Sequence, residues 1–517
     1  MNSFFNKQRT KKLLAGILAA VIFILPLAGC QDKALEGLFS SPAESSSAAP
    51  VQSQASSVQS SKAPSSQASA ISSAASIPKA EAKTSSVAAV KPEQKVQPKK
   101  TVASKAPTGN QSIKKIVADQ SAQSGTRLAV TQGTVAAAGY SHIDQRSGYN
   151  YLTDSVSRNL YSAMLQSAYK VTLQPASNGY YPTSRIVVNN SHLTEAQIRI
   201  VLMAFLNDNP QVFWLANAYS YGYNDTQTTI QLYSVVSQSQ CNTMIQQMNA
   251  KVSALVKAMP SGLSELDREV YLFDYLVKTC TYDTAAAADS TQWKAFTSYG
   301  ALVEGHVVCE GYSRAMQLLS SYAGLQCMLL TGQSDGVNHM WNLMKIGGNW
   351  YHLDITWCDN NPTIYNLFNI TDAVITQTHS IFPSASTLSA AQIEGSNGSA
   401  AAGCNLSIPV CTATAANYFQ AKGIHISDLN GTNDSAAVSA ITAAAKAKKE
   451  SVSFYVEGSA DFDQILNGML KSSPYKLVTY LNDVNKQPGM TNQIAINSLK
   501  YIADPSDRGM TIFLSYQ

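Results

Sequence analysis

The fold is decided by the stretch Val308-Cys309-Glu310-Gly311-Tyr312-Ser313-Arg314-Ala315, which opens a pattern of helical spacing. The pattern continues through Leu318, Leu319 and Tyr322 and ends at Gly324. This spacing predicts a helix that begins at Cys309. The free N–H groups and the dipole at the start of a helix favour an anion, so this position favours the thiolate form of Cys309. The alternative is an unreactive core residue, because free cysteine is among the most buried residue types.

Two further motifs lie on either side of Ile346-Gly347-Gly348-Asn349, which is typical of a two-residue hairpin turn. They are Asn338-His339-Met340-Trp341-Asn342 and Trp350-Tyr351-His352-Leu353-Asp354-Ile355-Thr356-Trp357. With the two glycines in the turn, Lys345 pairs with Trp350 and Leu343 pairs with His352. His339 and Asp354 are then diagonal neighbours on one face, with Cα atoms about 7 to 8 Å apart. A three-residue loop would place their side chains on opposite faces.

Cys309, His339 and Asp354 provide a nucleophile, a base and an acid that can orient the base, within 46 residues. The alternative is a core cysteine, a hydrogen-bonded histidine and an aspartate beside a turn. His352 lies on the same strand face as Asp354 and is a rival partner for its carboxylate. A zinc site could also use these four residues together with Cys358. No Cys-x-x-Cys pair or His-Glu-x-x-His helix supports a zinc site, so we expect neither a metal nor a cofactor.

Together, the motifs resemble those of the bacterial transglutaminase-like superfamily. The resemblance rests on Gly305 to Ser313, on His-x-Trp-Asn from His339 and on Trp-Tyr-His-x-Asp-x-Thr-Trp from Trp350, and it covers roughly residues 265–380. It implies an α+β fold, in which the helix with the cysteine packs on an antiparallel sheet. It also implies a papain-like site with Cys309 as nucleophile, His339 as general base and acid, and Asp354 as the residue that orients His339.

Residues 1–30 are typical of a lipoprotein signal peptide. A cationic stretch from Lys7 to Lys12 precedes an apolar run from Leu13 to Leu25, and Leu27-Ala28-Gly29-Cys30 follows. This ending resembles the lipobox of bacterial lipoproteins, which implies that Cys30 is the lipidated first residue of the mature chain. Two acyl chains on Cys30 would anchor the protein stably. We therefore expect an extracellular lipoprotein on the outer face of a bacterial cell membrane; the alternative is an ordinary cleaved signal.

Residues 31–139 predict a disordered tether. The chain has no Phe, Trp or Tyr from Ser40 to Gly139, and residues 41–80 contain 15 serines, so little apolar area is available to offset the entropy of ordering. Residues 1–110 carry 13 basic and five acidic groups, which leaves 24 basic and 28 acidic groups in residues 111–517. The folded part is slightly acidic, so the overall charge of +4 does not indicate nucleic-acid binding.

The rest of the chain predicts three domains: an N-terminal α+β supporting domain (140–262), a catalytic domain (263–385) and a small C-terminal α/β domain (405–517). In the first, helices at about 154–169, from Thr194 to Asn209 and from Cys241 to Met259 predict a helical layer, with one strand near Thr228 to Val235. In the last, the pattern predicts helices at 412–422, 435–448 and 460–471, and strands at 452–456, 475–481, 494–501 and 510–516.

The mature chain would have seven cysteines besides Cys30, so at least one is free or pairs between molecules. Cys309 is the candidate for the free thiol, and Cys404 could pair with Cys411 across a short loop. The combined expectation is a membrane-anchored thiol enzyme that transfers or hydrolyses an acyl group at an amide. Its expected partners are the membrane and a protein or peptide substrate, with the cell wall as a candidate source of that substrate. The alternative is a non-catalytic adhesion or scaffolding lipoprotein that keeps the fold.

Overall fold

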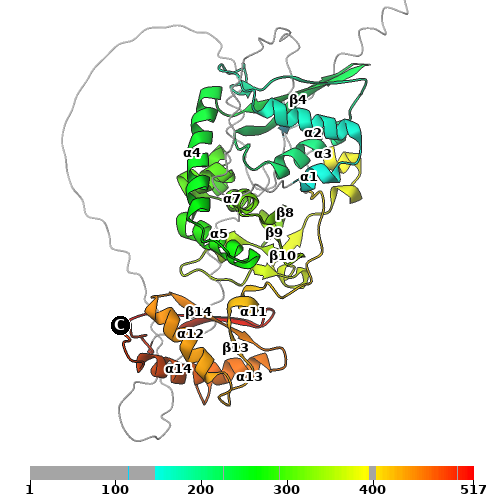
Figure 1. The fold of residues 1–517 in the computed structure, drawn as a ribbon. Coiled ribbons are helices and arrows are strands. Elements are labelled where there is room, and N and C mark those ends of the chain that lie inside the picture. The colour runs from blue at the N-terminus through cyan, green and yellow to red at the C-terminus, as the bar shows by residue number, and fades with distance from the viewer. Residues whose placement is uncertain (1–113, 116–145, 225, 290, 395–402, 498) are drawn as a thin grey trace, which may run out of the picture.

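A computed structural model describes residues 114–115, 146–224, 226–289, 291–394, 403–497 and 499–517 (Figure 1). The predicted signal peptide with Cys30, and the predicted tether apart from residues 114–115, lie outside these residues. Within the described ranges, none of the helices combines the length and the hydropathy that crossing a membrane requires.

The N-terminal part combines helices with a five-stranded sheet, shown in cyan and green at the top of Figure 1. The strands are β1 (Lys114–Lys115), β4 (Leu215–Tyr223), β5 (Gln227–Ser234) and β2 (Tyr181–Pro182) in that order, and β3 (Ile186–Asn189) also pairs with β5. The helices are α1 (Ser147–Tyr151), α2 (Ser155–Ala168), α3 (Glu195–Asp208) and α4 (Gln238–Ala258). This layer is therefore not helical alone, because strand β4, which the sequence does not predict, pairs with the predicted strand.

The predicted helices of this part are confirmed, and their starts have clear physical causes. Thr194 accepts a hydrogen bond from the Gln197 N–H, and the Gln197 side chain accepts one from the Thr194 N–H. This capping box satisfies N–H groups that the start of α3 would otherwise leave without partners. At the other end of α3, Asp208 accepts hydrogen bonds from the N–H groups of Gly148 and Tyr149, each at 2.7 Å. Asp208 thereby ties α1 to α3.

The central part contains a second five-stranded sheet, which is antiparallel throughout. Its strands are β11 (Phe368–Ile370), β10 (Asn349–Leu353), β9 (Val337–Ile346), β8 (Gln326–Ser334) and β12 (His379–Ile381) in that order. Helix α7 (Cys309–Tyr322) packs against β8 and β9, and α5 (Glu265–Thr279) packs against α7. The predicted α+β fold, with the cysteine helix on an antiparallel sheet, is confirmed.

Helix α7 is buried on nearly all sides, in the middle of the molecule (Figure 1). Thirteen of its 14 residues are buried, which is the pattern of a helix inside a larger core and not of a surface helix. Two short elements, β7 (His306–Val307) and α8 (Ile355–Cys358), contact it. The other short elements are β6 (Thr281–Tyr282), α6 (Thr284–Ala288), α9 (Asp372–Ile375) and α10 (Ala390–Glu394).

One hydrophobic core extends from the N-terminal part into the central part, and it includes Leu152, Trp214, Tyr312, Leu353 and Ala416. The C-terminal part has a separate core. Its sheet has the order β13 (Ile424–Ile426), β14 (Ser451–Val456), β16 (Gly509–Phe513), β15 (Lys500–Asp504), with only β13 and β14 parallel. The helices are α11 (Tyr418–Lys422), α12 (Asp434–Lys446), α13 (Phe462–Leu466) and α14 (Lys476–Asn485).

Three expectations for the C-terminal part are wrong in whole or in part. Residues 475–481 form the start of helix α14 and not a strand, because Leu477, Tyr480, Leu481 and Val484 are buried at helical spacing. The helix expected at 412–422 is limited to α11, and the strand expected at 494–501 contributes only its last two residues to β15.

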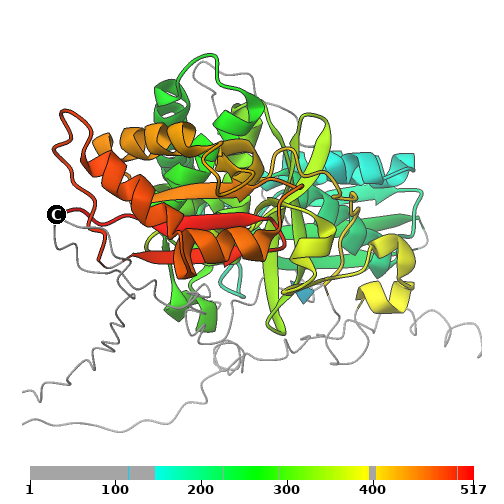
Figure 2. The same cartoon turned by 90° about the horizontal axis from the view of Figure 1, so that it is seen from below.

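The C-terminal part lies in front of the rest of the molecule in the view from below (Figure 2), and hydrogen bonds join it to the central part. The Asn366 amide donates a hydrogen bond to Asp504 at 3.0 Å, and the Ser506 hydroxyl donates one to Gln377 at 3.1 Å. The turn between β15 and β16 therefore rests on the chain that links β10 to β12.

Candidate active site

The hairpin formed by β9 and β10 has the predicted register. Lys345 pairs with Trp350 and Leu343 with His352, which leaves Gly347 and Gly348 as a two-residue turn. Both glycines have positive φ, +58° and +85°, as a tight hairpin turn requires. Strand β10 ends at Leu353, and the next residue, Asp354, caps helix α8 by accepting the Trp357 N–H at 3.2 Å.

The hairpin brings His339 and Asp354 into direct contact. Nε2 of His339 lies 2.7 Å from Oδ2 of Asp354, and each residue is only 1% exposed. Burial opposes the charged form of His339, but Asp354 and Cys309 outweigh this effect and raise the His339 pKa to about 10. Burial likewise opposes ionisation of Asp354, and the two nearby histidines outweigh it and hold the Asp354 pKa well below its usual range. The pair therefore favours an imidazolium beside a carboxylate.

Cys309 is the first residue of α7 and is fully buried. Val308, at the N-cap position, provides no side-chain hydrogen bond to the helix start, so the thiol lies near N–H groups that α7 cannot pair internally. The thiol is near enough to His339 to contribute to the rise in the His339 pKa. Nδ1 of His339 has no hydrogen-bond partner among the described residues. Because Asp354 takes Nε2, Nδ1 is the nitrogen that can exchange a proton with the sulfur.

Hydrogen bonds between α7 and β9 fix the positions of Cys309 and His339 relative to each other. The Ser313 hydroxyl contacts the carbonyl oxygens of Cys309 at 2.9 Å and of Met340 at 3.0 Å. The Asn342 amide donates to the Ser313 carbonyl at 3.0 Å. Ser313 and Asn342 belong to the sequence motifs, and these contacts give them a structural role.

His352 is not the partner of Asp354. Its Nε2 lies 2.8 Å from Asp372, and its Nδ1 accepts a hydrogen bond from the Trp341 indole at 3.0 Å. The rival assignment of His352 to the Asp354 carboxylate is therefore wrong. Trp341 also stacks on His339, with ring centres 5.9 Å apart, and is 1% exposed. It thus packs beside the His339–Asp354 pair and excludes water from that side.

His379 belongs to the site, although the sequence motifs did not identify it. Its Nε2 lies 3.1 Å from Oδ2 of Asp354, the same oxygen that contacts His339. It comes from the edge strand β12, which pairs with β8. Its only sequence signal was that it is one of seven histidines, and its position depends on a strand pairing that no local pattern predicts.

Among the residues that the structure describes, two groups of side chains have donor atoms close enough to consider for a metal: His339 with Asp354 and His379, and His352 with Asp372 and Cys411. Neither is the five-residue zinc set considered from the sequence. In the first group, the 2.7 Å contact is shorter than the roughly 3.3 Å between ligands of a tetrahedral zinc ion, and fits a hydrogen bond. In the second, the Trp341 N–H occupies Nδ1 of His352, so Nε2 carries the proton and cannot bind a metal.

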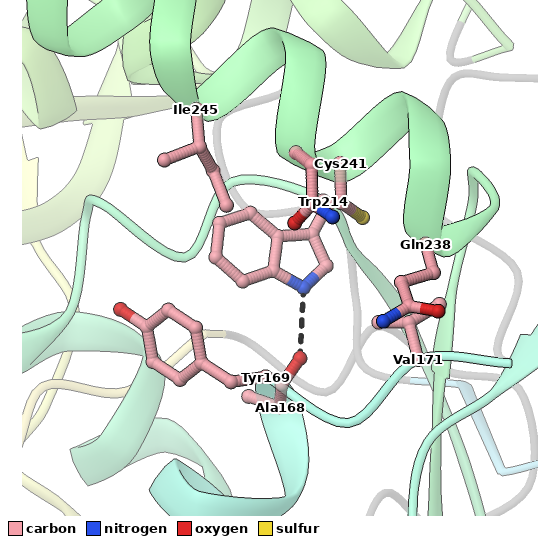
Figure 3. Close-up of a pocket in the computed structure, with 8 residues that line it drawn as sticks. Ala168, Tyr169, Val171, Trp214, Gln238, Cys241 and Ile245 are labelled. Atoms are coloured by element: carbon pink, nitrogen blue, oxygen red, sulfur yellow. Dashed lines mark hydrogen bonds between the residues drawn. The ribbon is translucent and has the colours of Figure 1, made fainter. Parts of the chain in front are cut away.

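None of the seven cysteines in the described residues forms a disulfide, so the suggested pair of Cys404 with Cys411 is not formed. Cys241 is buried, with an exposure of 4%. It lines a small pocket in the N-terminal part, between α2 and α4, where the Trp214 indole donates to the Ala168 carbonyl at 2.9 Å (Figure 3). The pocket residues are mostly apolar, and they do not include Cys309, His339 or Asp354.

Segments of the central part are similar in sequence to known proteins. The family model described as "Transglutaminase-like superfamily" matches residues 253–355. Kyphoscoliosis peptidase of Homo sapiens is 27% identical over 106 residues, which are 18% of this chain and 16% of that protein. The Mus musculus protein of the same name is 26% identical over 122 residues, 21% and 18% of the two chains. This chain thus spans less than a fifth of the length of these curated relatives.

Two solved structures also show similarity. A structure described as a TGase matches with a TM-score of 0.20 and 17% identity, over 33% of this chain and 50% of that chain. A proposed cysteine protease from Cytophaga hutchinsonii matches with a TM-score of 0.18 and 11% identity, over 36% and 70%. The family match covers the segment that contains Cys309, His339 and Asp354. Residues 253–355 of this chain therefore match the transglutaminase-like superfamily.

Proposed function

We propose that this protein is a thiol enzyme that transfers or hydrolyses acyl groups at amides, with Cys309 as nucleophile, His339 as general base and acid, and Asp354 as the residue that orients His339. The observation that carries the proposal is the 2.7 Å contact between His339 and Asp354, which leaves Nδ1 of His339 for the buried thiol. The transglutaminase-like match over residues 253–355 supports the same chemistry.

The chemistry needs two steps. The Cys309 thiolate attacks the amide carbonyl, the C–N bond breaks, and the His339 imidazolium gives its proton to the leaving amine, which produces a thioester. Water or a primary amine then attacks the thioester after giving a proton to His339, and the Cys309 thiolate is released. Water produces an acid, as in an amidase or peptidase, and an amine produces a cross-link. We favour hydrolysis.

The oxyanion formed in each step needs hydrogen-bond donors. The N–H of Cys309, at the start of α7, is one candidate. The Tyr282 hydroxyl is our side-chain candidate, because it is buried and has no hydrogen-bond partner among the described residues. Tyr282 on β6 pairs with Val307 on β7, two residues before the thiol, and its ring packs against the cluster that contains Val308. Burial and the charge of Cys309 both raise the Tyr282 pKa, so the hydroxyl stays protonated and can donate.

The proposed location is the outer face of a bacterial membrane, with a lipid anchor on Cys30. The lipobox-like ending at Cys30 supports it. A wall peptide or a surface protein is the substrate class that this location suggests. Metabolic labelling with a fatty acid tests the anchor: we expect label in the wild type and none in Cys30→Ser. A mature protein without acyl chains would remove the anchor from the proposal.

The central test offers the full-length protein a glutaminyl peptide with and without a labelled amine, and measures product masses. Hydrolysis converts the amide to an acid, and cross-linking adds the amine. Cys309→Ala and His339→Ala are expected to abolish both products. Cys404→Ala is the matched control, because Cys404 is a free, partly buried thiol elsewhere in the chain, and it should retain activity. Equal labelling of wild type and Cys309→Ala by a thiol-reactive acyl probe would instead favour a non-catalytic scaffolding protein.

A further inference from the structure

The edge strand β12 approaches the site unusually closely. His379 pairs with Ser334, and Ile381 pairs with Gly332, which itself lies opposite His339. A Cβ atom on Gly332 would lie only 2.0 Å from the Ser380 carbonyl oxygen. Only glycine therefore allows β12 to pair with β8 at this point, and this pairing positions His379.

The His379 ring is enclosed at the site. It is 4% exposed, and its ring centre lies 5.4 Å from that of His339, 5.1 Å from Trp341 and 6.0 Å from Trp357. Its Nδ1 lies 2.8 Å from the Thr378 hydroxyl oxygen, and its Nε2 lies 3.1 Å from Oδ2 of Asp354. Both ring nitrogens therefore have polar partners.

The protonation states of the partners fix the direction of these hydrogen bonds. Burial lowers the His379 pKa, so the ring is neutral near pH 7 and carries one N–H. Ionised Asp354 can only accept a hydrogen bond, whereas a hydroxyl can donate. The N–H is therefore on Nε2 and points to Asp354, while Nδ1 accepts from Thr378. The alternative acceptor of the Thr378 hydroxyl, the Ile375 carbonyl, is farther away at 3.4 Å.

Three donors thus share one carboxylate: the rings of His339 and His379 at Oδ2, and the Trp357 N–H at Oδ1. We propose that His379 is a positioning residue for the acyl-transfer reaction. Its hydrogen bond keeps the Asp354 carboxylate beside His339 and reduces the attraction of that carboxylate for the His339 proton. A carboxylate that already accepts a hydrogen bond attracts a neighbouring cation less strongly. A less tightly held proton is transferred more easily to a leaving amine.

This inference rests on the proposed function, but its main test needs no substrate. The titratable groups acting on His339 are Asp354 and Cys309, and those acting on His379 are Asp354, His339 and Asp335. The full-length protein is labelled with ¹³C-histidine, and the His339 ring signal is titrated by NMR. In His379→Leu, which keeps bulk but removes the donor, we expect the His339 midpoint to rise by about 0.5 to 1 pH unit. Glutamine at position 379 can donate again and should restore the wild-type midpoint.

His352→Gln is the matched control, because His352 is also buried in the same sheet but contacts Asp372 and not Asp354. Its effect on the His339 midpoint should be below about 0.2 units. Thr378→Val removes the donor to Nδ1 and should raise the midpoint less than His379→Leu; it also provides a readout if His379→Leu fails to fold. With substrate, His379→Leu should lower kcat by about 10-fold and leave KM unchanged.

The inference would be overturned if the His339 midpoint were unchanged or lowered in folded His379→Leu. If that variant does not fold, the same result in Thr378→Val would overturn it. Stoichiometric Zn²⁺ binding by wild type but not by His379→Leu would also overturn it, because the same three atoms would then hold a metal. Failure of Cys309 to form a thioester would refute the proposed function instead. The NMR midpoints would still report whether His379 acts on the His339–Asp354 pair.

Discussion

Nε2 of His339 lies 2.7 Å from Oδ2 of Asp354, although 15 positions separate the two residues in the sequence. A turn of two glycines produces this contact, because it fixes the strand register that places both side chains on one face. The contact explains why the imidazole can remain charged inside a buried site.

Asp354→Asn should therefore remove most of the activity and change its pH dependence. The His339 pKa is raised to about 10, so the imidazolium persists through neutral pH and loses its proton only as the pH rises toward that value. Without the carboxylate, the alkaline fall in kcat/KM should move to lower pH, and kcat should fall by about 10²- to 10⁴-fold. Asp372→Asn, which changes the partner of His352, is the control and should leave both unchanged.

Tyr282→Phe should separate acylation of Cys309 from alkylation. Loss of one oxyanion donor slows acyl transfer by about 10²-fold. Alkylation by iodoacetamide forms no oxyanion, so its rate should not change. Tyr299→Phe provides the control, since its hydroxyl donates to Gln247 in α4. Equal slowing of both reactions would show that Tyr282 serves packing alone.

Glu269→Gln should stabilise the protein at high pH. Glu269 in α5 is fully buried, accepts a hydrogen bond from the Asn369 amide at 2.7 Å, and burial raises its pKa to about 8. In the unfolded chain the Glu269 carboxyl ionises near pH 4.5, whereas in the folded protein it ionises only near pH 8. The folded state therefore loses stability progressively as the pH rises from about 4.5 to about 8. The glutamine variant should lack this loss and be more stable at pH 8 by about 2 to 4 kcal/mol.

Urea unfolding of both proteins at pH 5 and pH 8 measures this effect. The difference in unfolding free energy between the two proteins should grow with pH. A difference that is the same at both pH values would contradict a raised Glu269 pKa.

Gly332→Ala should destabilise the protein and reduce its activity. The added Cβ would meet the Ser380 carbonyl at 2.0 Å and would displace β12 with His379. We expect a loss of about 1 to 3 kcal/mol in unfolding free energy, as for other overpacked sites. Gly222→Ala is the matched control, because Gly222 is also in a strand but a Cβ there meets nothing within 4 Å. Similar losses in both variants would contradict the close-approach argument.

The sequence predicted the parts of the site that depend on local patterns. The helix beginning at Cys309 follows from apolar spacing, and the register of Leu343 with His352 follows from the two-glycine turn. Both patterns lie within one element or one hairpin. The roles of Cys309, His339 and Asp354 remain predictions until activity is measured.

The parts that were missed depend on long-range contacts. His379 reaches Asp354 only because β12 pairs with β8, whose paired residues lie 45 to 49 positions earlier in the chain. Helix α14 was mistaken for a strand, since a short apolar run fits either period and only packing against the C-terminal core decides between them. The partner of His352 could not be predicted either, because Asp372 lies beyond the hairpin.

Cys309 has no exposed surface, and His339 and Asp354 have almost none. An amide carbonyl can reach the sulfur only when neighbouring chain segments move apart and expose the thiol. The apparent rate of thiol modification should therefore equal the rate for an exposed thiol multiplied by the fraction of molecules in this open conformation. Denaturant too dilute to unfold the protein, or a binding partner that favours the open form, would then quicken thiol modification without any change in the chemistry of the sulfur.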